Sequence, residues 1–126
     1  MGLDVVFWAP MDGVDIEAVR KLPGFGPARS TDLAISHWAE YDRSFVVIHS
    51  YWRYCGPSYH RGHWPQIKKL AQELKKLLPG LHYTNDCHMW MNEDNPGGIE
   101  CDDTWFADMD AIWARMVAER PKLAEW

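Results

Sequence analysis

The sequence contains little that would place the protein in a membrane or in an oxidising compartment. Its 126 residues include no apolar run near the length of about eighteen residues that a spanning helix requires. The opening MGLDVVFWAP has neither the basic region nor the long apolar stretch of a signal peptide. The 3 cysteines, Cys55, Cys87 and Cys101, form no Cys-x-x-Cys pair. These absences predict a cytoplasmic protein with free thiols and no membrane partner.

The signatures of common enzyme families are absent as well. The chain has no Gly-x-Gly-x-x-Gly, no Gly-Lys-Ser/Thr and no Gly-x-Ser-x-Gly sequence. An excess of positive charge is also missing, since 13 basic residues face 18 acidic ones and the net charge is −5. Duplex nucleic acid needs a positive field, so direct duplex binding is not expected. We therefore expect a protein that works by binding rather than by turnover, with no cofactor.

Apolar and aromatic residues are plentiful by contrast. Apolar residues make up 47% of the chain, and a chain of this length folds most naturally as one domain spanning residues 1–126. The 8 tryptophans are an unusual number. Their large flat surfaces require either burial or a partner.

Hydrophobic periodicity and turn residues predict the elements of this domain. Strands are expected at 3–9, 44–52, 81–84 and 87–92, and helices at 16–22, 65–78 and 104–119. A further helical turn capped by Ser30 or Thr31 is expected, and residues 93–100 read as a loop. In the last helix Phe106, Met109 and Trp113 are expected to face inward.

The order of these elements favours an α/β or α+β fold. We expect a single two-layer domain in which one mixed sheet of about four strands is packed by two to four helices. The apolar start of strand 44–52 predicts a central strand covered on both faces. Strand 44–52, helix 65–78 and strand 81–84 would form a right-handed β-α-β unit with parallel strands.

The segment between that strand and the second helix, YWRYCGPSYHRGHWPQI at 51–67, is the first candidate site. Arginines there suit phosphate or carboxylate, histidines exchange protons near neutral pH, and aromatic rings stack on a base. The candidate ligand-binding residues are Arg53, Tyr59, His60, Arg61, His63, Trp64 and Asp86. They predict a site that binds or hydrolyses a phosphate-bearing small molecule such as a nucleotide signal. The alternative is an aromatic connection that closes the core.

The same segment resembles a group of small bacterial and phage-encoded proteins. The run from Tyr54 to Pro65 is similar to their Gly-Pro-x-Tyr-x-Arg-Gly-x-Trp-Pro stretch, and the likeness covers residues 51–86. Their downstream strand ends Tyr-Gly-Gly-Asp, whereas Thr84 and Asn85 stand here before Asp86. The resemblance implies an accessory protein of the immunity or anti-defence kind. It also implies that Pro57, Tyr59, Arg61, Gly62, Trp64 and Asp86 form one constellation.

Two catalytic or metal arrangements remain open alternatives. His60 and His63, with Cys87-His88, Cys101 or the aspartates 102 and 103, include ligand types that zinc accepts, although no pair has the spacing of a zinc knuckle. Cys55 near His60 is a possible nucleophile, although a buried and inert cysteine is the simpler interpretation. The patterns are too unspecific to assign either role, so we predict no bound metal and no catalytic residue.

The second candidate site is acidic and rich in tryptophan. Residues 93–110 carry seven carboxylates, most of them explained by a solvated face and a helix N-terminus. Trp90, Asp102, Asp103 and Trp105 are the candidate interface residues. Aromatic anchors and opposite charge suit a partner protein with a basic surface, so the leading prediction is a protein that inhibits a nuclease, toxin or defence effector.

Overall fold

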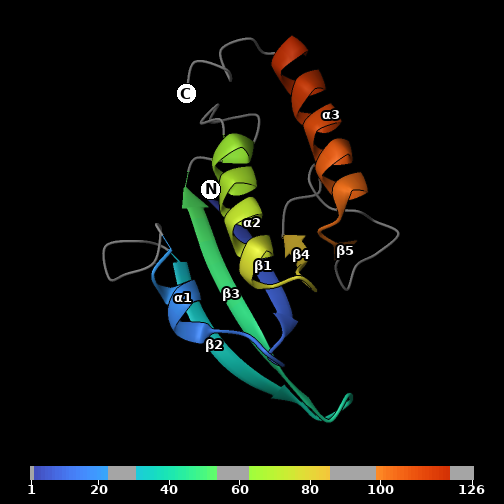
Figure 1. The fold of residues 1–126 in the computed structure, drawn as a ribbon. Coiled ribbons are helices and arrows are strands. Elements are labelled where there is room, and N and C mark those ends of the chain that lie inside the picture. The colour runs from blue at the N-terminus through green and yellow to red at the C-terminus, as the bar shows by residue number, and fades with distance from the viewer. Residues whose placement is uncertain (1, 23–30, 54–62, 86–98, 120–126) are drawn as a thin grey trace.

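One antiparallel sheet of five strands organises the structure (Figure 1). The computed structural model describes residues 2–22, 31–53, 63–85 and 99–119. The elements follow along the chain as β1 (Gly2–Pro10), α1 (Ile16–Arg20), β2 (Thr31–Trp38), β3 (Arg43–Arg53), α2 (His63–Leu77), β4 (His82–Asn85), β5 (Ile99–Glu100) and α3 (Asp103–Glu119). No helix among these described residues has the length and apolarity needed to cross a membrane.

The strands lie in the order β2-β3-β1-β4-β5. The first four strands with α1 and α2 have the connectivity of the ferredoxin-like, or split β-α-β, topology. The fold class is thus confirmed as α+β, but the expected mixed sheet is wrong, because every strand pair is antiparallel. β3 and β4 do run in the same direction, with β1 inserted between them. The sequence pattern predicts that helix α2 connects two strands of the same direction, but it does not show that another strand lies between them.

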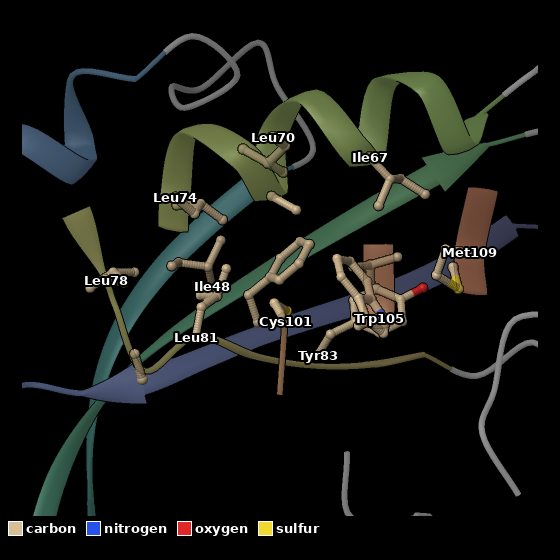
Figure 2. Close-up of a cluster of buried hydrophobic side chains, with 14 of the residues drawn as sticks. Ile48, Ile67, Leu70, Leu74, Leu78, Leu81, Tyr83, Cys101, Trp105 and Met109 are labelled. Atoms are coloured by element: carbon tan, nitrogen blue, oxygen red, sulfur yellow. The ribbon is translucent and has the colours of Figure 1, made fainter. Parts of the chain in front are cut away.

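The helices cover one face of this sheet and form the core with it. Alternate strand residues such as Phe7 and Ile48 are fully buried there, against Ile67 and Leu74 of α2 and Trp105 of α3. Figure 2 shows Ile48, Ile67, Leu74 and Trp105 converging in the core beneath α2. The helix predicted at 65–78 is confirmed, although it begins at His63 rather than at Pro65 and ends at Leu77. Burying such a set of side chains contributes most of the folding free energy.

The predicted helical turn after residue 30 is wrong, because residues 31–38 form β2. All eight of these residues pair with β3, from Thr31 opposite Ser50 to Trp38 opposite Arg43. On the buried face, the hydroxyl oxygens of Thr31 and Ser50 lie 2.9 Å apart and share a hydrogen bond. The segment forms a strand despite the local helix-capping signal, because pairing with β3 satisfies backbone N–H and C=O groups along the whole segment.

Two further elements differ from the expectation at the other end of the chain. Ile99 and Glu100, predicted as loop, form β5 and pair with Tyr83 and His82. The expected strand at 87–92 lies outside the described residues. The buried side of α3 consists of Trp105, Met109 and Met116, while Phe106, Ile112, Trp113 and Val117 pack partly against the core.

The β2–β3 hairpin extends beyond the helices that cover the sheet (Figure 1). Its turn is closed by hydrogen bonds from Tyr41 N–H to the Trp38 carbonyl at 3.0 Å and from Asp42 N–H to the Ala39 carbonyl at 3.2 Å. Asp42 adopts a left-handed conformation with φ 46°, which aspartate tolerates better than most residues. Because helical cover is lacking at this end, Ile35 remains 47% exposed and Tyr41 65% exposed.

Candidate functional site

Most residues of the predicted ligand-binding loop lie outside the described part of the structure. Tyr59, His60, Arg61 and Asp86 lie outside the described residues, and so do the motif residues of the resemblance from 54 to 62. The backbone places Arg53 in the last position of β3 and His63 in the first position of α2, whereas the sequence predicts both in the connecting loop. The phosphate site and the resemblance therefore stay predictions.

Trp64 is the predicted site residue whose position is clear, and it belongs to the core. It is 1% exposed, and its indole N–H donates to Asp110 Oδ1 on α3 at 3.0 Å. Lys68 Nζ donates to the same carboxylate at 2.9 and 3.0 Å. These hydrogen bonds lower the pKa of Asp110, with Lys68 the largest cause. The indole is thus used to join α2 to α3 rather than to line an open ligand site.

This network predicts a pH-dependent stability difference. The folded protein holds the pKa of Asp110 below its ordinary value of 3.8, so its stabilising contribution is complete above that value. The contribution disappears as the pH falls through the lower pKa of the folded state. We expect Asp110→Asn to lower the free energy of unfolding by about 0.5–1 kcal/mol at pH 7, because the carboxylate is half-exposed and screened by water.

Denaturant unfolding at pH 7 and at pH 2 to 3 measures this difference. Asp108→Asn is the matched control, since Asp108 is an exposed carboxylate on the same helix. The control should stay within about 0.5 kcal/mol of the wild type. An Asp110→Asn difference that persists undiminished in acid would contradict the assignment.

The predicted interface residues separate into different roles. Trp105 is 2% exposed and its ring packs 4.9 Å from that of Tyr83, so the expectation of a surface indole there is wrong. Asp102 Oδ1 accepts the Trp105 backbone N–H at 2.8 Å and caps α3. Asp103 is exposed in the first turn of that helix, and Trp90 lies outside the described residues. Met109 follows Trp105 by four residues, which places both side chains on the same side of a helix. This spacing is the sequence signal that could have revealed the buried side of α3.

Cys101 is unsuited to nucleophilic or metal chemistry. It is 1% exposed, and burial, the largest cause, raises the pKa of its thiol, so the thiolate that either chemistry requires is disfavoured. Within the described ranges no three histidine, cysteine or acidic side chains are grouped to hold a metal ion. Cys55, His60, Cys87 and His88 lie outside those ranges, so the alternatives that use them remain untested.

The feature that sequence reasoning missed is the sheet face opposite the helices. The strand register places Trp8 and His82 side by side on this face, with Trp38 and Phe45 on the two strands beyond β1. The rings of Trp8 and His82 stack at 5.7 Å and 19°, and those of Trp38 and Phe45 at 4.1 Å and 23°. We call Trp8, Trp38, Tyr41, Phe45 and His82 the aromatic cluster.

A hollow of about 490 Å³ opens within the aromatic cluster. Its volume falls within the range of about 300–1,000 Å³ that ligand sites occupy. The two tryptophan rings are 6.3 Å apart and tilted by 52°, and Tyr41 packs 6.3 Å from Trp38. The lining residues are Val6, Trp8, Trp38, Tyr41, His82 and Thr84. Large rings that are already held in place by their neighbours suit binding without much further ordering.

The charge around this face is negative. Asp32 and the turn residues Glu40 and Asp42 are exposed, and Asp42 Oδ1 lies 3.4 Å from His37 Nε2. Arg43 is the only arginine or lysine on this face among side chains that the structure describes, and it donates from Nε to Asp12 Oδ2 at 2.8 Å. An aromatic hollow beside an excess of exposed carboxylates favours a cationic partner.

A second hollow in the described structure, a groove of about 750 Å³ between α2 and α3, is a weaker candidate. Its lysines already have partners: Lys68 pairs with Asp110, and Lys76 pairs with Glu73 at 2.9 Å. Lys75 donates to the Cys101 carbonyl and lies 5.9 Å from the Phe106 ring centre. The groove therefore offers little unused charge.

Comparison with protein-family models, curated proteins and solved structures finds no match to this chain.

Proposed function

We propose that this chain acts by binding a partner protein with a basic surface, and that the aromatic cluster is the docking surface. The observation that carries the proposal is the gathering of partly exposed rings around a hollow on a sheet face without a described helix over it. Tryptophan and tyrosine provide much of the binding free energy in protein interfaces, since they bury large areas with few rotatable bonds.

Charge supports a basic partner. The whole chain carries −5, and the exposed Glu40 and Asp42 flank the cluster residue Tyr41, while Asp32 lies farther along β2. Opposite charge accelerates encounter and disfavours acidic competitors. The same charge argues against nucleic acid, although its bases also stack on aromatic side chains. The narrower prediction, that the partner is a nuclease, toxin or defence effector and that binding inhibits it, follows from the same basic surface.

The proposed interface is a different surface from the acidic start of α3. Trp105 contributes to the core, and Asp102 contributes a helix cap. Two surfaces can therefore be compared directly: the aromatic cluster, probed at Trp38, and the start of α3, probed at Asp103 and Asp108. Both surfaces carry exposed carboxylates, but of the two only the aromatic cluster offers large described rings for burial.

Selection of random displayed peptides on the immobilised chain tests this comparison. We expect enriched peptides to be positively charged and to bind the Trp38→Ala variant about 30-fold more weakly, the effect of losing a strong interface residue of about 2 kcal/mol. The double variant Asp103→Asn/Asp108→Asn should bind them with little change. Circular dichroism confirms that each variant is folded. Peptides that bind Trp38→Ala as tightly as the wild type would overturn the proposal, and loss of binding only in the α3 variant would restore the interface predicted from sequence.

A further inference from the structure

The geometry points to an arginine side chain as the group that enters the hollow of the aromatic cluster. We infer that the guanidinium stacks on Trp8 and Trp38 and donates hydrogen bonds to His82 and Thr84, all four of which line the hollow. That this arginine belongs to a partner protein rests on the proposed function. The cation preference itself rests on the hollow and the carboxylates beside it.

The first step is the arrangement of the rings. A cation within about 6 Å of an aromatic ring centre is attracted by the negative face of the ring, most strongly by tryptophan. Trp8 and Trp38 each have one neighbouring ring stacked against them, His82 and Phe45 respectively, and both indoles also line the hollow. These stacks hold the indoles in place before a ligand arrives, which reduces the entropy lost on binding.

The second step is the set of hydrogen-bond acceptors. His82 Nδ1 lies 2.8 Å from the Gly80 carbonyl, and because a carbonyl only accepts, Nδ1 carries the proton. In the neutral ring Nε2 then keeps its lone pair, at the opposite end of the imidazole. Together with the Thr84 hydroxyl it can accept from the N–H groups of a guanidinium, whose planar form also stacks on indoles. A quaternary ammonium ion has no N–H group and would leave both acceptors unused.

The third step is charge. Among the described residues that line the hollow there is no lysine, arginine, aspartate or glutamate. A bound cation is therefore not neutralised by direct pairing, but it is attracted by Glu40 and Asp42, which flank the lining residue Tyr41 in the hairpin turn. Arg43 is already bonded to Asp12 and does not compete for these carboxylates. The site thus combines ring faces, neutral acceptors and a negative rim.

Titration with Nα-acetyl-arginine methylamide, followed by the indole N–H signals in ¹H–¹⁵N spectra, tests the inference. The matched probe is the citrulline methylamide, which has nearly the same shape but no charge. We expect the Trp8 and Trp38 signals to shift, with arginine bound at least fivefold more tightly than citrulline. Trp38→Leu should abolish the shift at Trp8, His82→Phe should reduce arginine affinity severalfold, and Phe106→Leu in the α2–α3 groove should leave it unchanged.

Equal binding of the two probes would show an apolar hollow only and overturn the inference, as would the absence of any shift. Arginine binding that survives Trp38→Leu but is lost in Phe106→Leu would assign the cation to the groove instead. These results are independent of the peptide selection. Peptides that require Trp38 but contain no required arginine would support the proposed function and refute the arginine site. Binding of the arginine probe without any peptide binding would support the arginine site and refute the proposed function.

Discussion

Replacing Trp105 with alanine is expected to lower the free energy of unfolding by about 3–5 kcal/mol, the usual effect of deleting a large aromatic ring from a core. The side chain is 2% exposed and touches rings from three elements. Its ring centre lies 5.5 Å from that of Trp64 and 4.9 Å from that of Tyr83, so its removal leaves a cavity where α2, α3 and β4 meet. Figure 2 shows Trp105 beside Tyr83 and Met109 in this region.

Two matched variants make the Trp105 result specific. Tyr41→Ala removes an aromatic ring that is 65% exposed, and it should change the free energy of unfolding by no more than about 1 kcal/mol. Trp105→Phe should be milder than Trp105→Ala, because the indole N–H has no hydrogen-bond partner within the described structure and none is broken by its removal. Chemical denaturation measures all three. An alanine variant as stable as the wild type would place Trp105 outside the core.

Replacing Ser50 with alanine is expected to destabilise the protein by about 1–3 kcal/mol, although it removes a single oxygen atom. Ser50 is 1% exposed and Thr31 is 7% exposed, and their hydroxyl groups share a hydrogen bond of 2.9 Å on the helix-covered face. Without Ser50 Oγ, the Thr31 hydroxyl is left buried without its partner. An unpaired buried hydroxyl loses its hydration without replacement, which accounts for the size of the effect.

The double variant Thr31→Val/Ser50→Ala separates this mechanism from a simple packing loss. It removes both polar groups and keeps the shape, so its stability should return close to that of the wild type. Ser36→Ala, on the opposite face of β2, is the single-oxygen control and should have little effect. Denaturant midpoints decide the matter. A double variant less stable than Ser50→Ala alone would show that the two residues act independently.

The buried helix stripe illustrates how far periodicity alone reaches. Ile67, Leu70, Leu74 and Leu78 recur at helical spacing, and all four are buried because a helix with one apolar side has a single way to cover a sheet. The same reasoning placed β1 and β3 correctly, since runs of β-branched and aromatic residues leave few alternatives. Pro65 led to a predicted start of α2 that is two residues too late, because proline is accepted throughout the first turn of a helix.

The open sheet face shows where such reasoning stops. Trp8 and Trp38 are thirty residues apart in sequence, and their meeting depends on β3 lying between β2 and β1. His82 joins them only because β4 pairs with the other edge of β1. No local pattern in these segments specifies the strand order. The sequence therefore shows an excess of tryptophan but does not show that Trp8 and Trp38 meet, and the predicted interface falls in the acidic region near Trp105.

The sequence by itself determined the secondary-structure types of most segments, a single domain of helices packed on one sheet, and the negative charge, because periodicity, turn residues and composition act over short distances along the chain. The tertiary structure alone decided which tryptophans are buried and which surround a hollow. A single residue step moves a side chain from one sheet face to the other, and only strand pairing fixes which face the helices cover. That choice placed Trp105 inside and left Trp8 and Trp38 on the opposite face.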